Sequence, residues 1–276
     1  MTLDCEVVLT RSGAPAMRDR CSGEVMHPLV GPLVEAERLY LAPSRLAQRL
    51  RDADARTLVL LDVGLGAGSN AIAAWRLAAA LPARRRVLQM VSFDRSRAAL
   101  ELALRPEHAA AFGLDGPAGE AARALLEQGS AVSPQAEWRL RLGELPGSLA
   151  LEPAAGADIV FWDPFSPSAN PELWSWQAFT ALRRLCAEGA SVHTYSGATA
   201  TRSALLLAGF AVGVGEMIGP GRFATTASTR LADLTSPLDR RWLDRLARSS
   251  AGFPADAPGD ALQRIRALPQ FAPDQR

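Results

Sequence analysis

Short apolar runs alternate with segments of helical periodicity along most of this 276-residue chain. The apolar runs, each of strand length, are residues 58–61, 87–93, 138–142, 159–162 and 192–195. The segments with apolar residues at helical spacing are residues 70–81, 96–104, 119–128, 174–187 and 199–208. Strands that alternate with helices in this way form a mostly parallel sheet covered by helices on both faces. We therefore predict an α/β, doubly wound fold of the Rossmann-like type.

The chain divides into three parts in this prediction. Residues 1–56 are interrupted by many Gly and Pro residues and form a short N-terminal appendage or lid. Within it, residues 39–41 resemble a strand, and Ser44 is placed to cap a short helix. Residues 57–230 form the α/β domain, and residues 231–276 form a helical tail.

The α/β domain is predicted to end in an antiparallel ribbon. Residues 210–214 and 223–228 have strand composition, and the turn Gly219-Pro220-Gly221 between them reverses the chain. The tail then shows helical patterns at residues 238–247 and 261–268. We expect these two helices to follow the last strand of the sheet.

Composition excludes several classes of protein. The 30 Arg and Lys residues nearly balance the 29 Asp and Glu residues, so no strong overall field gathers nucleic acid or an anionic membrane. Cys5, Cys21 and Cys186 are too far apart for a Cys-x-x-Cys metal motif or a disulfide framework. The N-terminus lacks a basic segment followed by an apolar run, and no apolar stretch reaches about 20 residues. We expect a cytoplasmic protein with neither a metal site nor a membrane segment.

The first predicted strand leads directly into Asp62-Val63-Gly64-Leu65-Gly66-Ala67-Gly68-Ser69-Asn70. Parallel sheets bind ligands at the carboxyl ends of their strands, which makes this turn a candidate cofactor site. Gly64, Gly66 and Gly68 let the backbone turn sharply and approach a ligand. Asn70 begins the next helix and is a further candidate for contact with the cofactor. The spacing departs from the dinucleotide-binding pattern, and Asp62 would repel a pyrophosphate. Asp62 could instead receive the ammonium group of S-adenosylmethionine (SAM).

Two further acids follow the next two strands. Asp94 ends the second strand, where an acid commonly accepts two hydrogen bonds from a ribose diol. Glu144 follows the third strand and could lie near the adenine edge, or cap the next helix. Together with Asp62, these acids favour SAM over a dinucleotide. They predict the class I SAM-dependent methyltransferase form of the fold.

The loop after the fourth strand is the candidate reacting end. It begins Asp163-Pro164-Phe165, so a buried strand delivers one carboxylate to the edge of the cofactor site. Pro164 restrains the loop, and Phe165 offers a flat face for a planar amine or base. Such a loop is typical of methyltransferases that act on nitrogen, because the acid can align the amine and accept its proton. The alternative is that Asp163 only caps the turn, but a second restrained stretch at residues 168–175 argues for a pocket.

These residues resemble the methyltransferase domain of the MnmC-type family, which completes 5-methylaminomethyl-2-thiouridine at the wobble position of tRNA. The resemblance covers most of residues 22–229. Its motifs are Asp163-Pro164-Phe165-Ser166-Pro167, Asn170-Pro171-Glu172-Leu173-Trp174, Gly23-Glu24-Val25-Met26-His27, Gly31-Pro32-Leu33-Val34-Glu35-Ala36 and Gly219-Pro220-Gly221-Arg222. The resemblance implies that Gly64, Gly66, Gly68 and Asp94 bind SAM and that Asp163 is the catalytic acid.

Several residues near these motifs are candidates for binding the substrate. Two acids in an apolar, glycine-rich segment could bind an amine, and aromatic residues beside the loop could stack a base. The candidates are Glu24, His27, Glu35, Pro164, Phe165, Trp174 and Arg222. The resemblance implies tRNA as the partner. Bifunctional members of the family carry an oxidase domain after the methyltransferase, and the chain ends too soon for one, so we expect methyl transfer alone, with a separate oxidase as a possible partner enzyme.

The sequence departs from the family after Arg222, where Phe223-Ala224-Thr225 replace a typical Lys-Arg pair. This weakens the expected contact to RNA phosphates. Two alternatives therefore stay open. The first is a SAM-dependent methyltransferase, or an aminopropyltransferase-like enzyme, that acts on a small-molecule amine. The second is a SAM-binding or RNA-binding protein without catalysis.

Overall fold

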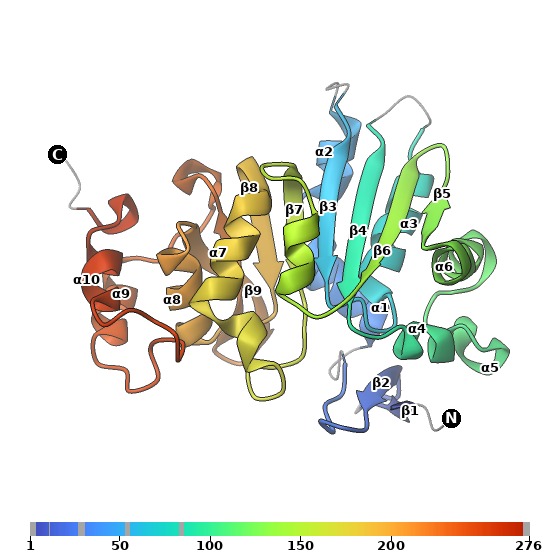
Figure 1. Cartoon of the computed structure of the whole chain (residues 1–276), viewed down its shortest axis with the longest axis horizontal. Coiled ribbons are helices and arrows are strands. Elements are labelled where there is room, and N and C mark those ends of the chain that lie inside the picture. The colour runs from blue at the N-terminus through green and yellow to red at the C-terminus, as the bar shows by residue number, and fades with distance from the viewer. Residues whose placement is uncertain (1–3, 11, 27–30, 53–55, 83–85, 273–276) are drawn as a thin grey trace.

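The structure is a computed structural model that describes residues 4–10, 12–26, 31–52, 56–82 and 86–272 of the chain. Its centre is an eight-stranded sheet between two sets of helices (Figure 1). In spatial order the strands are β5 (Ser130–Val132), β6 (Ala136–Leu142), β4 (Leu88–Asp94), β3 (Leu58–Val63), β7 (Ala157–Trp162), β8 (Cys186–Thr194), β10 (Arg222–Ser228) and β9 (Ala211–Gly219). The predicted α/β architecture is confirmed.

The five central strands, from β6 to β8, are parallel, and the outer strands β5, β10 and β9 are antiparallel to the strands that they pair with. The chain builds from β3 through β4 to β6 and then returns to the other side of β3 to form β7. This reversal creates a switch point at the carboxyl ends of β3 and β7, where open α/β sheets bind ligands. The predicted terminal ribbon is present as β9 and β10. The short edge strand β5 was not predicted.

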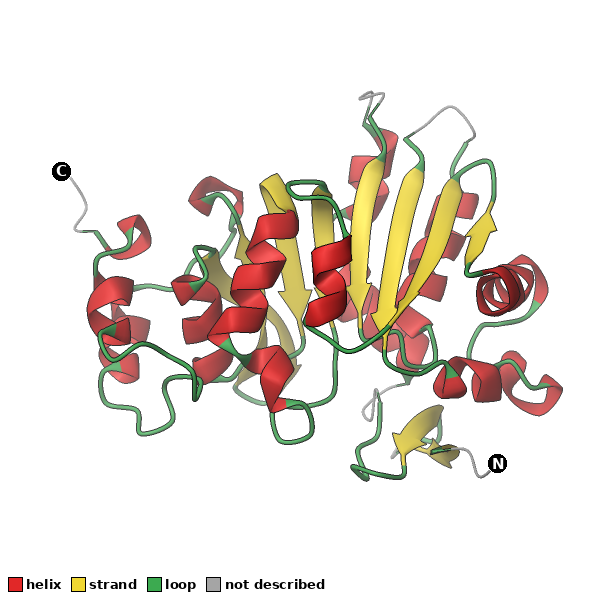
Figure 2. Ribbon diagram, viewed as in Figure 1, coloured by secondary structure: helices red, strands yellow, loops and turns green. Residues whose placement is uncertain are grey.

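Helices cover both faces of the sheet (Figure 2). One apolar core joins the sheet to α1 (Pro32–Ala36), the π-helix η1 (Glu37–Leu41), α2 (Leu46–Arg51), α3 (Ser69–Ala79), α4 (Ala98–Ala103), α5 (Pro106–Ala109) and α6 (Gly116–Gln128). A second core, on the opposite face, joins it to α7 (Trp176–Leu185), α8 (Thr199–Leu207), α9 (Arg240–Leu246) and α10 (Ala261–Arg266). Every residue of β7 is buried because both faces of this strand are covered.

Short 3-10 helices complete the chain: η2 (Gly147–Leu151), η3 (Pro171–Trp174), η4 (Leu231–Asp233) and η5 (Pro269–Phe271). The two predicted tail helices are present as α9 and α10. Trp242 of α9 stacks on Phe271 with ring centroids 6.1 Å apart, and both side chains belong to the second core. No described helix combines the length and apolar character needed to cross a bilayer.

The N-terminal strands β1 (Cys5–Leu9) and β2 (Pro15–Asp19) form a hairpin that is separate from the main sheet. Figure 1 shows this hairpin beyond the carboxyl ends of β3 and β4. The chain that follows it lines the cavity described below. The N-terminal segment thus lies at the end of the sheet where ligands are expected.

Two local predictions for this segment were wrong. Residues 39–41 form part of the helix η1 rather than a strand, and all three are buried. The Tyr40 ring packs 5.3 Å from the Phe161 ring of the sheet. Because three consecutive apolar residues of this helical turn are buried, the sequence shows no helical spacing of apolar residues here. Ser44 does not cap α2, because its hydroxyl donates to the Leu41 carbonyl and Arg45, with φ of 54°, precedes the helix.

The helix predicted over residues 174–187 is divided in the structure. Trp174 ends η3, α7 runs from Trp176 to Leu185, and β8 begins at Cys186 without an intervening loop. Ser175 caps α7 by accepting a hydrogen bond from the Ala178 N–H. The predicted strand at residues 192–195 therefore continues further toward the N-terminus than its apolar run indicates.

A buried carboxylate holds the amino end of β7. Asp158 is 3% exposed and accepts hydrogen bonds from Arg56 at 2.6 and 3.2 Å and from the Val59 N–H at 2.9 Å. Arg49 and Arg86 lie at 3.8 and 4.0 Å from the same carboxylate. Arg49 belongs to α2, so this network joins α2 to the amino-terminal end of the sheet, opposite the carboxyl ends of the strands.

Candidate functional site

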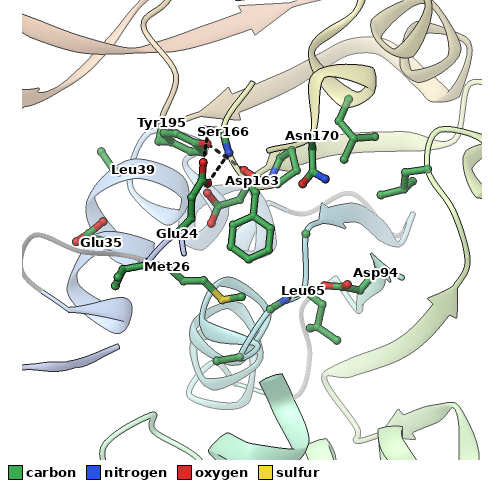
Figure 3. A pocket seen from close by; sticks show the side chains of 18 of the residues that line it. Glu24, Met26, Glu35, Leu39, Leu65, Asp94, Asp163, Ser166, Asn170 and Tyr195 are labelled. Atoms are coloured by element: carbon green, nitrogen blue, oxygen red, sulfur yellow. Dashed lines mark hydrogen bonds between the residues drawn. The ribbon is translucent and has the colours of Figure 1, made fainter. Parts of the chain in front are cut away.

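A cavity of about 550 Å³ lies at the carboxyl ends of β3, β4, β7 and β8. The segment after β2, the helices α1 and η1, the β3–α3 turn and the tip of the β9–β10 hairpin complete its walls. Its acidic lining residues are Glu24, Glu35, Asp94, Glu144, Asp163 and Glu172, and its basic ones are Arg95 and Arg222. The lining therefore favours a cationic ligand. Figure 3 shows Glu24, Ser166, Tyr195 and Asp163 grouped together, with Asp94 and Leu65 apart from them.

Gly64 brings the two main loops of the cavity together. Its φ is 92°, and a Cβ atom there would lie 2.5 Å from the Asp163 carbonyl oxygen. The Asp163 N–H in turn donates to the Val63 carbonyl at 2.8 Å. A side chain at position 64 would therefore push the loop after β7 away from the β3–α3 turn.

Asp94 ends β4 and lines the cavity. Its Oδ2 accepts the Gly66 N–H at 2.9 Å, and its Oδ1 accepts the Ser96 N–H at 3.0 Å. Burial raises the pKa of the Asp94 carboxyl above its usual value, although these hydrogen bonds oppose the shift. The carboxylate is thus fixed against the glycine turn.

Gly66 and Glu144 also line the cavity, whereas Gly68 does not. Gly68 precedes α3 with a φ of 84°, and a Cβ atom there would lie 3.0 Å from Ile72 and 3.2 Å from Leu100. Its role in the structure is to let α3 start close to the apolar core. Direct contact between Gly68 and a ligand stays a prediction.

Asp62 does not line the cavity either, although we predicted a direct contact to the cofactor. It is 1% exposed on β3, and its Oδ2 accepts the Ser92 hydroxyl at 2.7 Å. The same hydroxyl accepts the Trp138 indole N–H at 2.9 Å. The carboxylate thus links β3 to β4 behind the glycine turn, and its position argues for support of the site rather than for direct binding.

Asn70 was predicted to contact the cofactor, and the structure places it against Asp163 instead. The Asn70 Nδ2 donates to the Asp163 Oδ2 at 2.7 Å, and Asn70 is 3% exposed. Asp163 lines the cavity at the end of β7. The first turn of α3 therefore holds the candidate catalytic carboxylate.

Two tyrosines that we did not predict flank Asp163. Burial, and then the Asp163 charge, raise the pKa of Tyr195 and that of Tyr40 far above the usual value. The Tyr195 hydroxyl donates to the Pro164 carbonyl at 3.0 Å. Tyr195 directly follows β8, the last of the parallel strands. Its position at the carboxyl end of a strand could have identified it as a site residue from the sequence. Tyr40 lies in the turn whose structure was predicted wrongly.

Of the aromatic and proline candidates for substrate binding, Pro164 and Phe165 line the cavity, whereas Trp174 does not. The Trp174 indole N–H donates to the Phe165 carbonyl at 2.8 Å, and its ring packs edge-on against Tyr195 at 5.6 Å. The residue is 4% exposed. Trp174 therefore supports the loop that carries Phe165, and the structure gives it no contact with the cavity.

Glu24 lines the cavity and connects two segments of its wall. Its carboxylate accepts hydrogen bonds from the Ser166 N–H at 2.9 Å and from the Ser166 hydroxyl (Figure 3). These bonds join the N-terminal segment to the loop after β7 across 142 residues of sequence. Glu35 and Arg222 line the cavity too. His27, the remaining candidate, lies outside the described residues.

The strand order, the switch point and the glycine turn define the class I fold of SAM-dependent methyltransferases. A sequence model of the S-adenosyl-L-methionine-dependent methyltransferase family matches residues 126–230. No three His, Cys, Asp or Glu side chains gather as a metal site among the described residues.

Comparison with curated relatives identifies a narrower family within this class of methyltransferases. The bifunctional MnmC protein of tRNA 5-methylaminomethyl-2-thiouridine biosynthesis from Methylibium petroleiphilum is 31% identical over 80% of the chain, and that from Cupriavidus necator is 32% identical over 81%. These matches cover 34% and 35% of the two relatives, so the chain spans about a third of their length. The chain belongs to the MnmC-type methyltransferase family.

Solved structures agree on the fold. MnmC2 from Aquifex aeolicus has a TM-score of 0.72 and 24% identity, covering 96% of this chain and 86% of that one. Spermidine synthase from Thermotoga maritima has a TM-score of 0.53 and 12% identity, covering 96% of this chain and 84% of that one. At these identities the likeness concerns the fold alone.

Proposed function

We propose that this protein transfers a methyl group from SAM to the amine of 5-aminomethyl-2-thiouridine in tRNA. The observation that carries the proposal is the carboxylate of Asp163, held by Asn70 at the end of β7 beside the glycine turn, in an acidic cavity. The curated relatives are named for biosynthesis of tRNA 5-methylaminomethyl-2-thiouridine, which supports its unmethylated amine as the substrate. With tRNA as its substrate, we place the reaction in the cytoplasm.

The cavity fits SAM in its chemistry. Gly64 and Gly66 form part of its wall, where the missing side chains let the Asp163 backbone and Met26 pack against the turn, and Asp94 presents its carboxylate at the adjacent strand end. The apolar side chains of Leu65 and Phe93 lie in the same wall. SAM carries a positive sulfonium and an ammonium group, which an acidic lining attracts, and it supplies a methyl group on a good leaving group.

The residues around Asp163 can align and deprotonate an amine. One carboxylate oxygen is directed by Asn70, and the carboxylate can accept a hydrogen bond from an incoming amine and later its proton. Phe165 offers a planar face for a base, and Pro164 is anchored by the Tyr195 hydroxyl. The protein's contribution is therefore alignment and removal of water, together with a proton acceptor. We assign the second activity of the bifunctional relatives, the oxidase, to a separate enzyme.

The test combines the protein with isotopically labelled SAM and tRNA from cells that lack the final methylation, followed by mass spectrometry of the nucleosides. We expect the wild type to incorporate label into the wobble uridine and Asp163→Asn to lose at least about 100-fold in rate, at the low end for loss of a general base. Asp115→Asn is a matched control, because Asp115 is exposed and pairs with Arg76 outside the cavity. Calorimetry should show that all three proteins bind SAM.

A small-molecule amine is the second candidate, because an acidic cavity attracts any cationic amine. Adding putrescine and other free amines to the same assay separates the two. Label in a free amine, with none in tRNA, would contradict the tRNA proposal and retain the methyltransferase. Absence of SAM binding would contradict both.

A further inference from the structure

The tip of the β9–β10 hairpin presents an exposed aromatic residue next to the cavity. Phe223 is 40% exposed and is the one aromatic among the exposed large apolar side chains in the described part of the chain. Met217, its partner across the hairpin, is 52% exposed. The two residues are partners in the antiparallel ladder, which shifts register on either side of this pair, and their exposed side chains form one apolar surface.

The backbone under this surface is held rigidly. Arg202 of α8 donates to the carbonyls of Phe223 at 3.3 Å and of Ala224 at 3.1 Å, and it is 9% exposed. Gly197 packs so closely that a Cβ atom there would overlap the Phe223 carbonyl oxygen. An aromatic side chain that stays in water while its backbone is fixed loses little entropy when a ligand covers it.

The same hairpin also borders the cavity. Ile218, Gly219, Pro220 and Arg222 line it. Phe223 directly follows Arg222 in β10, so its side chain lies on the opposite side of the strand, beside the cavity on the outer side of the hairpin. Arg222 and Arg38 supply positive charge there, and the Arg38 guanidinium lies 3.5 Å from the Met217 carbonyl oxygen. An exposed aromatic side chain flanked by arginines is the combination that binds single-stranded nucleic acid, through base stacking and phosphate contacts.

We propose that Phe223 and Met217 form a stacking platform for the nucleobase next to the acceptor nucleotide, with Arg222 or Arg38 contacting the intervening phosphate. The inference rests on the proposed tRNA methyltransferase function. A cavity of about 550 Å³ has the size of a small-molecule site, so an RNA can bring only its reacting group to the bound cofactor, and the neighbouring nucleotides stay at the rim.

The experiment measures binding of a fluorescent RNA stem-loop that carries the aminomethyl uridine, by anisotropy with the full chain. We expect Phe223→Ala to weaken binding about ten-fold, within the range for truncating an aromatic under one stacked base. Phe223→Tyr should bind like the wild type, and Phe223→Leu should bind like the alanine variant, because leucine is apolar but has no flat face. Val132→Ala is the control, since Val132 is 75% exposed on β5, at the opposite edge of the sheet.

Stem-loops with an abasic site on either side of the acceptor identify the stacked base. With one of them, wild type and Phe223→Ala should bind equally, because the partner of the ring is gone. Equal binding of all variants to the intact stem-loop would overturn the stacking platform. If the wild type still transferred the methyl group to the RNA, the proposed methyltransferase function would stand. A change in sedimentation of Phe223→Ala without a change in RNA affinity would assign the surface to protein association instead. A wild type that binds SAM but neither binds nor methylates the RNA would overturn both proposals.

Discussion

The Nδ2 atom of Asn70 lies 2.7 Å from the Oδ2 atom of Asp163, and this hydrogen bond joins the first turn of α3 to the end of β7. The two residues are 93 positions apart in sequence and come from the two loops that meet at the switch point. The loop expected to bind the cofactor therefore also directs the candidate proton acceptor.

Asn70→Ala should lower kcat about ten-fold or more, because a hydrogen bond to a charged group contributes about 1.5–3 kcal/mol. Methyl transfer to tRNA at saturating substrate measures the effect, and calorimetry of SAM binding separates it from loss of cofactor. Gln177→Ala is the control, since Gln177 is exposed at the surface of α7. Unchanged kcat in Asn70→Ala would show that Asp163 needs no directing donor.

The two tyrosines of the chain, Tyr40 and Tyr195, should stay un-ionised in the folded protein at alkaline pH. Burial and the Asp163 charge raise the pKa of both well above the usual value near 10. An ultraviolet titration of phenolate absorbance should therefore show no ionisation until the protein unfolds. Because the folded-state pKa values are raised, their contribution to stability is complete below about pH 10 and is lost as the pH rises above it. A reversible phenolate signal near pH 10 in the folded protein would contradict this.

Thiol reagents should distinguish the three cysteines. Cys21 is exposed, whereas Cys5 and Cys186 are buried. Burial raises the pKa of Cys5 and raises that of Cys186 to about 12, which removes the reactive thiolate at neutral pH. At pH 8 we expect one thiol to react quickly with an aromatic disulfide reagent and two only in denaturant. Cys21→Ser should abolish the fast phase, and a fast phase of more than one thiol would disprove the assignment.

Asp158→Asn should destabilise the fold by about 3 kcal/mol, because it removes the carboxylate that compensates partly buried arginines. Urea unfolding measures the loss as a lower midpoint at unchanged slope. Asp260→Asn is a suitable comparison, since Asp260 pairs with Arg264 at the exposed surface, and such pairs contribute about 1 kcal/mol or less. Equal stability of the two variants would show that the buried network contributes little.

The order of strands and helices in this protein was largely predictable from local patterns. The apolar runs that became β3, β4 and β7 start or end within two residues of the predicted bounds, because strands buried on both faces are continuous apolar segments. Local patterns failed where tertiary packing overrides them. The turn around Tyr40 is apolar where it packs against the sheet, and Cys186 begins β8 directly after α7.

The sequence by itself determined which loops form the site, since Gly64 and Asp163 directly follow β3 and β7 and Asp94 ends the adjacent strand β4. Only the tertiary structure decided what each side chain contacts. Asp62 turned toward the adjacent strand, and Asn70 turned toward Asp163. Glu24 reached Ser166 from 142 residues away. Strand periodicity reports burial of a segment, but the direction of one side chain at a strand end depends on neighbours that are distant in sequence, and these meet only when the sheet has formed.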